Sequence, residues 1–333
     1  MALWSNSSLN TNRVSLAFSN MAWNNIVDIT RRKYGLWYAA LGKMDKGAMV
    51  DNRLTFKEIQ EVTGYKFEVT FQGKIPTYNK VAKGTPELAR VSYTYDSNIF
   101  GGYQFDLCQY YYKHPIPKSD YDQLRGNEMK TENYLNAIVK YCVAGLDNQI
   151  SDDIHANVTQ TETSIAGTRF IVADDNTYAF DRTDAANSKF QSQIDNASSA
   201  QLTLDMLALN QNKCIDGGGN PKLGLADIAR YTDIQRLVQD QAFYTSHKDW
   251  DDFGGKWVGY GNTVYCMDNR TTANTVYHLD PEYWFLVRNQ TPLNTEAIIL
   301  DPTLVGGYCL PVHLYLGVGC VLPSGQGRIH TLL

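Results

Sequence analysis

The stretch PVHLYLGVGCVLPSGQGRIHTLL, residues 311–333, decides the fold that we expect for this chain. Its first half alternates, with apolar side chains at Leu314, Leu316, Val318, Cys320 and Leu322. Such alternation is typical of a strand with one buried face. The segment 323–327 has the composition of a turn and leads into a second run, 328–333. The sequence therefore predicts a hairpin that ties down the chain end, where most proteins fray.

Length and composition bound the class of protein. The chain has 333 residues and 37.5 kDa, a size for one large or two linked domains. Hydrophobic residues make up 43% and charged residues 20%, which excludes wholesale disorder, and 22 tyrosines favour strands. The net charge of −5 gives no electrostatic argument for wrapping nucleic acid, although local basic patches stay open.

Cysteine spacing and the polar start indicate a cytosolic origin. No CxxC pair and no zinc-like spacing occurs, so we expect reduced thiols that fill the core. The opening residues 1–13 are too polar for a signal peptide, and no apolar run reaches the roughly 18 residues of a membrane span. The six cysteines are Cys108, Cys142, Cys214, Cys266, Cys309 and Cys320.

A long hairpin is predicted in the first third of the chain. Residues 65–71 and 91–95 alternate with period two, and the segment 73–86 between them is rich in Gly, Pro and Lys. An isolated hairpin is marginally stable in water, so we expect this one to lie on another chain. Gly101-Gly102 then precedes an aromatic strand at 103–110 that returns towards the core.

A long helix is predicted at 131–157, where apolar residues recur every three or four positions. It would span about 40 Å at 1.5 Å per residue. The stripe consists of Leu135, Ile138, Val139, Cys142, Leu146, Ile150 and Ile154.

The rest of the chain predicts a mixed α/β unit over 200–300. It contains two helices, which we expect at 200–212 and 226–239. A polar stretch at 184–199 precedes it. Strands are expected at 168–172, 177–180, 223–225, 256–260, 263–266 and 274–286.

Chemical motifs are few, and the plainer interpretation of each is favoured. Gly217-Gly218-Gly219 lacks the pattern of a phosphate loop and predicts a flexible helix end. Asp152-Asp153 and Asp174-Asp175 are adjacent in sequence, so their carboxylates diverge and suit capping or solvation better than acid–base catalysis. Ser324 lies in a predicted hairpin tip and lacks the GxSxG pattern of a nucleophile.

The histidines give no metal motif either, because no HExxH or His-x-His occurs. We therefore expect no catalytic, cofactor-binding or metal-binding residues, no cofactor and no enzyme activity. One alternative stays open: Tyr244 and Trp250 could serve as platforms in a carbohydrate-contact loop of a carbohydrate-binding or hydrolytic protein. The six histidines are His114, His155, His247, His278, His313 and His330.

The order of these elements resembles that of the tailed-bacteriophage major capsid proteins with the HK97 fold, and the resemblance covers essentially the whole chain. The segments that carry it are GGYQF at 101–105, LDPEYW at 279–284 and the run 316–332. None of them is a catalytic signature.

The resemblance implies an α+β fold with the family's regions. It assigns residues 1–50 to an N-terminal arm and 51–113 to an extended E-loop hairpin. Residues 114–199 would form a peripheral domain with its spine helix at 131–157, and 200–300 an axial domain. Residues 301–333 would return to the peripheral domain.

The resemblance also implies a function. Hexamers and pentamers of one chain would tile an icosahedral shell around double-stranded DNA, in a virion assembled in the host cytoplasm. Its partners would be further copies, a portal, scaffolding and decoration proteins, and DNA on the inner face, with no membrane. Since the chain begins almost directly with the arm, we expect a separate scaffolding protein or none.

Two points stay open at this level. An encapsulin-like cellular compartment would use the same fold around an enzyme cargo. Some members of the capsid family also crosslink an E-loop lysine to a neighbour's asparagine, for which the candidates by region are Lys57, Lys66, Lys74, Lys80 and Lys83.

Overall fold

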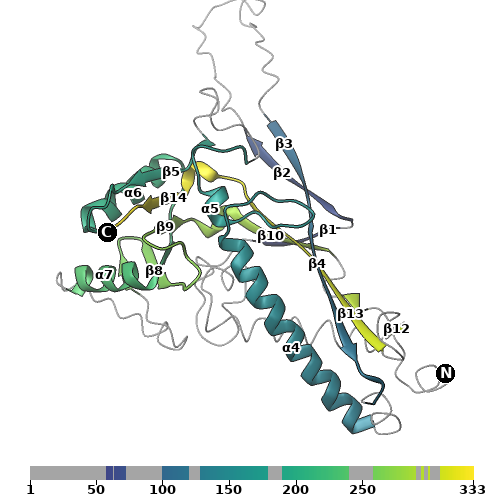
Figure 1. The fold of residues 1–333 in the computed structure, drawn as a ribbon. Helices are drawn as coiled ribbons and strands as arrows, with labels where there is room; N and C mark the ends of the chain where they lie inside the picture. Colours follow the sequence, from purple (N-terminus) through teal and green to yellow (C-terminus); the bar gives the residue numbers. More distant parts are fainter. Residues whose placement is uncertain are drawn as a thin grey trace, which may run out of the picture.

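The computed structural model describes residues 58–62, 64–72, 100–119, 128–178, 190–239, 258–289, 294–295, 299–300 and 308–333. Its strands form two six-stranded sheets and one two-stranded sheet, and its helices lie beside them (Figure 1). The architecture is α+β, as the sequence predicts.

The first sheet is built on one long strand, β13 (Tyr308–Cys320). Over residues 308–316 it pairs antiparallel with β4 (Cys108–Ile116), and over 316–320 it pairs antiparallel with β10 (Trp284–Asn289). The remaining strands of this sheet are β1 (Glu58–Val62), β11 (Asn294–Thr295) and β12 (Ile299–Leu300). We call β4 and residues 308–316 of β13 the ribbon; it extends well beyond β1 and β10 (Figure 1).

The long helix α4 (Glu128–His155) runs beside β4, which confirms the prediction of a helix at 131–157 with its start three residues earlier (Figure 1). The buried members of its stripe among the described side chains are Ile138, Cys142, Ile150 and Ile154, and Leu146 is half-buried. Charged residues interrupt its outer face, and no helix in the described ranges is long and apolar enough to cross a membrane.

The second sheet forms a compact unit with two helices. Helix α6 (Leu204–Asp216) begins four residues later than predicted, because the Thr203 side chain accepts a hydrogen bond from the backbone N–H of Met206 and caps the helix there. Helix α7 (Ile228–Gln239) follows strand β6. In sheet order the strands are β5 (Gln193–Asn196), β14 (Gly327–His330), β9 (Val276–Leu279), β6 (Leu223–Ala226), β8 (Thr263–Met267) and β7 (Val258–Tyr260).

The predicted C-terminal hairpin is wrong. Strand β13 buries Leu314, Leu316, Val318 and Cys320 as expected, although Gly317 and Gly319 between them are buried too. However, β14 lies in the other sheet, parallel to β5 and antiparallel to β9. The turn at 323–325 is a buried 3₁₀ helix, η5 (Pro323–Gly325), and not an exposed tip. Ile329 and Leu332 are buried in the hydrophobic cluster under α6 and α7, so burial in that cluster prevails over local hairpin pairing.

The two-stranded sheet forms the base of the predicted hairpin. Strand β2 (Lys66–Gln72) confirms the period-two run at 65–71, with Phe67 and Val69 buried. Its antiparallel partner is β3 (Phe100–Asp106), which contains Gly101-Gly102. The strand expected at 91–95 lies outside the described residues.

Other local predictions also need correction. Residues 168–171 form a short helix, α5 (Thr168–Ile171), instead of a strand. Its preceding residue Gly167 packs against the end of α4 so closely that a Cβ would lie 1.8 Å from the Ala156 carbonyl oxygen, which forces the chain to turn. No strand is present at 177–178, and 179–180 lie outside the described ranges.

The sequence does not predict one of the observed strands, and one predicted strand is interrupted in the structure. Strand β5 lies inside the polar stretch 184–199, where pairing with β14 replaces the absent apolar pattern. The strand expected at 274–286 is interrupted by η4 (Pro281–Tyr283), since Asp280 caps that turn and Pro281 starts it, and β10 continues in the first sheet. The domain boundaries stay a prediction.

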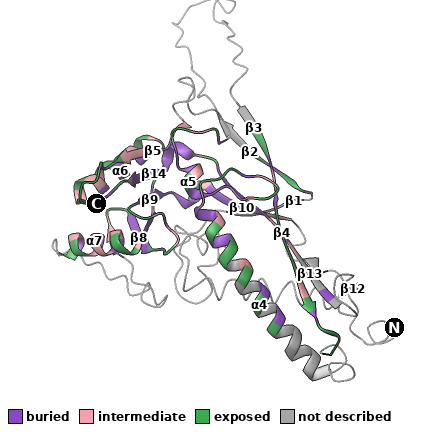
Figure 2. Ribbon diagram, viewed as in Figure 1, coloured by how far each residue is buried: buried purple, intermediate pink, exposed green. Residues whose placement is uncertain are grey.

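Two buried clusters are present among the described residues. The larger joins the two sheets, since it contains Trp284, Leu316 and Val318 of the first sheet, the end of α4, and Leu225 and Leu279 of the second sheet. The smaller lies under α6 and α7. Figure 2 shows the buried residues concentrated where the two sheets meet, and exposed ones along the ribbon and the outer face of α4.

Candidate functional site

One face of the ribbon carries exposed aromatic and polar side chains. The Tyr111 side chain is 48% exposed, and its ring centroid lies 4.5 Å from that of His313 on the paired strand. The Lys113 Nζ lies 5.5 Å from the Tyr111 ring centroid, and the Gln109 Nε2 donates a hydrogen bond of 3.2 Å to the His313 Nδ1. Contacts among these side chains hold them in place, which lowers the entropy cost of binding a partner.

The opposite face of β4 contacts α4. The Tyr110 hydroxyl donates a 2.7 Å hydrogen bond to the Asp153 carboxylate. Burial, and then the neighbouring Cys108 and Asp153 charges, raise the pKa of Tyr110, so the phenol stays protonated and can donate. Further along, the rings of Tyr112 and Tyr141 lie 6.4 Å apart and remain 41% and 64% exposed. The helix is thus fixed to the ribbon, with aromatic side chains left at the surface.

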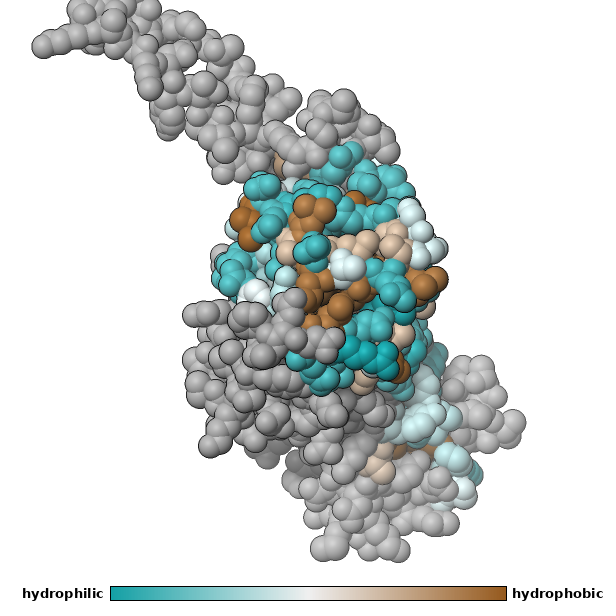
Figure 3. Space-filling model, turned by 90° about the vertical axis from the view of Figure 1, so that its left-hand side faces the viewer, coloured by the Kyte–Doolittle hydropathy of each residue, from teal (hydrophilic) through white to brown (hydrophobic). Residues whose placement is uncertain are grey.

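Exposed side chains differ between the two ends of the molecule. The most exposed aliphatic side chains among the described residues belong to the second-sheet unit: Leu209, Ile215, Ile228, Met267 and Leu333. Figure 3 looks at this end and shows brown side chains gathered among teal ones. Exposed tyrosines lie instead on β3, β4, α4 and the turn before β2: Tyr65, Tyr103, Tyr111, Tyr112 and Tyr141. Tyrosines are enriched in protein interfaces, so both ends offer contact surfaces of different chemistry.

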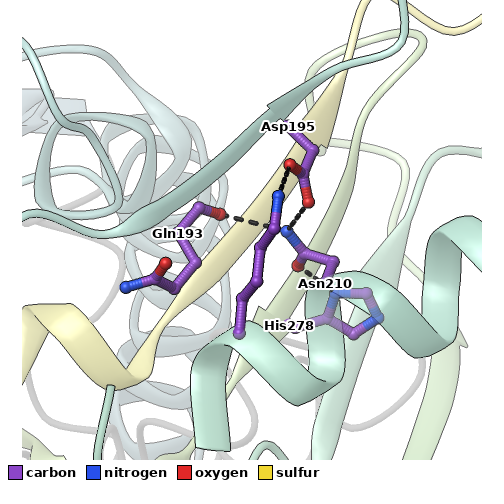
Figure 4. Close-up of polar contacts among 5 residues, drawn as sticks. Gln193, Asp195, Asn210 and His278 are labelled. Carbon is purple, nitrogen blue, oxygen red and sulfur yellow. Dashed lines mark hydrogen bonds and ion pairs between the residues drawn. The ribbon is translucent and has the colours of Figure 1, made fainter. Parts of the chain in front are cut away.

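A polar network that is buried at His278 and Asn210 and half-exposed at Lys213 lies beneath α6 in the second-sheet unit (Figure 4). The Asn210 Nδ2 donates to the Gln193 carbonyl oxygen at 3.1 Å and to the Asp195 carboxylate at 2.7 Å. The Asn210 Oδ1 lies 2.6 Å from the His278 Nδ1. An ion pair between Lys213 and Asp195 closes one end. These bonds tie α6 to both β5 and β9.

The donor and acceptor in each hydrogen bond around His278 can be assigned consistently. Because the Asn210 Oδ1 can only accept, the His278 Nδ1 must donate to it, and the His278 Nε2 must accept from the Tyr265 hydroxyl at 2.7 Å. The Gln211 Nε2 donates to the same hydroxyl at 2.8 Å. Burial lowers the pKa of His278 to about 3, so the ring is neutral. His278 and Tyr265 are fully buried, so neither can touch a substrate.

The other histidines lie apart from one another. His155 pairs with the buried Asp268 at 3.2 Å, and His114 lies 6.0 Å from the Tyr141 ring. Burial lowers the pKa of His114, and burial followed by nearby arginines lowers that of His330. His247 is outside the described residues. Within the described ranges no group of three His, Cys, Asp or Glu side chains could hold a metal ion.

All six cysteines are free and buried, which confirms the prediction of core-filling thiols. Burial raises the pKa of Cys108 and Cys142 to about 11 and that of Cys214 to about 12, so these thiols stay protonated at neutral pH.

The adjacent carboxylates do not act as pairs. Asp152 forms an ion pair with Arg270, whereas Asp153 accepts from Tyr110 and from Gln149. Asp174 and Asp175 are exposed. The structure thus brings neither pair to a common site.

The glycine run 217–219 is not a flexible end. A Cβ on Gly217 would lie 2.0 Å from the Ser324 carbonyl oxygen, and one on Gly219 would lie 2.4 Å from that of Gly325. Gly218 has φ +91°, a conformation that glycine favours. The run thus ends α6 as predicted, but its backbone packs closely against 324–325 instead of forming a loose end.

Two further expectations can be located only in part. Lys66 is exposed and lies 3.4 Å from the Asp106 carboxylate. The other crosslinking candidates, Lys57, Lys74, Lys80 and Lys83, and the loop 244–250 lie outside the described residues.

The sequence pattern missed three buried amides. The Gln160 side chain takes the place of a peptide group beside β13, accepting from the Val318 N–H at 3.3 Å and donating to the Leu316 carbonyl at 3.3 Å. Asn210 and Gln326 are likewise fully buried. A lone polar residue between apolar neighbours gives no signal of its partners, which only the tertiary fold supplies.

Comparisons with known proteins identify the fold. No family model and no curated protein matches the chain. Among solved structures, the chain is similar to a cyanophage A-1(L) capsid protein at 12% identity and a TM-score of 0.60, over 88% of this chain and 97% of that one. It is also similar to the capsid of a native GTA particle, at 8% identity and a TM-score of 0.57, over 87% and 94%.

A third similar structure is that of Mycobacterium phage Bobi, at 10% identity and a TM-score of 0.53, over 86% of this chain and 92% of that one. All three matches span nearly the full length of both chains, so the likeness includes both sheets and the long helix. The chain has the fold of phage capsid proteins.

Proposed function

We propose that this chain is a major capsid protein of the HK97 type, located in the virion, whose hexamers and pentamers tile an icosahedral shell around double-stranded DNA. The observation that carries the proposal is the full-length likeness to the cyanophage A-1(L) capsid protein. The exposed surfaces agree with it, since the tyrosines of the ribbon and α4 and the aliphatic side chains of the second-sheet unit lie far apart on one molecule. Each copy can therefore contact different neighbours with different regions.

In this proposal the regions keep the roles that the resemblance implies. Residues 51–113 form the E-loop, α4 is the spine helix, and the second-sheet unit is the axial domain. A portal, scaffolding and decoration proteins would be further partners. The proposed role is structural, as the likeness to phage capsid proteins suggests. Among the described residues, His278 and Tyr265 of the polar network are buried within the protein.

Purified protein tests the proposal directly. We expect light scattering to report large particles and electron micrographs to show round, closed shells, with or without a coexpressed scaffolding candidate. Protein that stays monomeric under all of these conditions would contradict it.

The contents of the particles test the finer claim. Shells isolated from the source should contain nuclease-protected double-stranded DNA. An enzyme cargo without DNA would instead indicate a cellular compartment of the same fold.

A further inference from the structure

Two segments carry the chain between the two sheets. The first crossing, residues 280–283, leads from β9 to β10, and the second crossing, residues 321–326, leads from β13 to β14. Their backbones are joined directly, because the Val321 N–H donates a 2.9 Å hydrogen bond to the Tyr283 carbonyl oxygen. The relative position of the sheets therefore depends on how these crossings are held together, in addition to the buried cluster that the sheets share.

One side-chain oxygen holds both ends of the first crossing. The Gln326 Oε1 accepts from the Asp280 N–H at 2.8 Å and from the Trp284 indole N–H at 3.0 Å. Asp280 follows the last strand residue in the second sheet, and Trp284 is the first strand residue in the first sheet. The Gln326 Nε2 donates to the Leu322 carbonyl at 3.0 Å, within the second crossing itself.

The Gln326 oxygen is enclosed by buried, hydrogen-bonded residues. Gln326 and Trp284 are fully buried, and Asp280 is 1% exposed. The Asp280 carboxylate accepts from the Asn220 N–H at 2.7 Å, and the Ser324 hydroxyl donates to the Gly217 carbonyl at 2.9 Å. Hydrogen bonds thus hold both crossings to the second-sheet unit. The indole of Trp284, the first residue of β10, links Gln326 to the first sheet.

We propose that Gln326 is a positioning residue that fixes the angle between the two sheets and, through it, the curvature at which copies of this chain join. This rests on the proposed function. The exposed tyrosines lie on the first-sheet side and the exposed aliphatic side chains on the second. A change in the angle between the sheets therefore changes the angle between the two contact surfaces, and with it the diameter of a closed shell.

The test compares particle diameters in electron micrographs. Gln326→Met removes all three side-chain hydrogen bonds at nearly constant volume, and we expect its particles to show a shifted or broadened diameter distribution. Ile234→Ala is the control, because Ile234 is buried in the hydrophobic cluster under α6 and α7, away from both crossings. The control should lower the melting temperature and keep the diameter of the unmodified protein.

Several outcomes would overturn the inference. Gln326→Met shells with the unmodified diameter would do so, and so would Ile234→Ala shells that broaden equally. If Gln326→Met does not fold, Trp284→Phe removes the indole hydrogen bond together with part of a buried ring and should also shift the diameter; unchanged Trp284→Phe shells then count against the inference.

If the unmodified chain forms no particles, the proposed function fails separately. Small-angle X-ray scattering of the soluble chain then decides on Gln326. A distance distribution unchanged by Gln326→Met would refute its positioning role.

Discussion

The ribbon with α4 differs from the second-sheet unit in where aromatic and polar side chains lie. The ribbon is long and narrow, and exposed tyrosines lie on it and on α4 beside it. The second-sheet unit is compact, with six paired strands and a polar network in which His278, Asn210 and Tyr265 satisfy one another away from water. Polar groups that satisfy one another inside a region need no partner chain, whereas a region that exposes aromatic surface gains by contact with other chains.

The largest effect should come from the last strand of the second sheet. Deleting residues 328–333 removes β14 from between β5 and β9 and exposes both strand edges, so we expect insoluble protein. Solubility and circular dichroism check this. The matched change Leu333→Ser alters only an exposed side chain and should leave the fold intact. A soluble, folded truncation would show that the unit does not depend on β14.

Next in size is the loss of the central amide of the network. Asn210→Leu leaves the His278 N–H and the Gln193 carbonyl without this partner and removes one of two donors to the Asp195 carboxylate, which keeps its ion pair with Lys213. We expect it to lower the free energy of unfolding by about 3–5 kcal/mol. Urea unfolding measures it. Asn212→Leu, at an exposed position of the same helix, should change stability by less than about 0.5 kcal/mol. Equal effects of the two changes would argue against the network.

The ribbon side has its own buried amide. Gln160→Leu removes the bonds that seal β13 beyond the end of β4, and we expect a loss of about 2–4 kcal/mol. Gln109→Leu, on the exposed face, should cost far less. If the two changes cost the same in urea unfolding, the sealing role assigned to Gln160 is wrong.

The sequence predicts the elements better than their partners. The period-two run at 65–71 and the stripe of α4 are local patterns, and the structure confirms both. The C-terminal hairpin fails because β14 pairs with β9, about 50 residues earlier in the chain, a choice that alternation alone cannot reveal. Gln160 and Gln326 were missed for the same reason, since their partners come from distant strands.

Acidification should weaken the second-sheet unit. The pKa of His278 is about 3 in the folded chain, below its unfolded value of about 6.5, so its contribution is present above pH 6.5 and is lost as the pH falls towards 3. Between pH 7 and pH 5 the loss should be about 2 kcal/mol. Urea midpoints across this range measure it, and His278→Gln should flatten the dependence. An unchanged slope in that variant would assign the effect to other groups.

The smallest effect on stability should come from the ribbon surface. Tyr111→Ser removes an exposed ring and should change the free energy of unfolding by less than about 0.5 kcal/mol, while it reduces particle yield. Lys118→Ser, also exposed, serves as the control for yield. A large loss of stability, or an unchanged yield, would remove the distinction between the two regions.

The central claim is that the ribbon makes contacts between copies while the second-sheet unit folds around its own network. A cryo-electron microscopy structure of assembled particles tests it most directly. The prediction is that neighbouring copies bury Tyr111, Tyr112 and Tyr141, and that the hydrogen bonds of Asn210 and His278 stay as they are in the single chain. Closed shells in which these tyrosines remain exposed to solvent would contradict the claim.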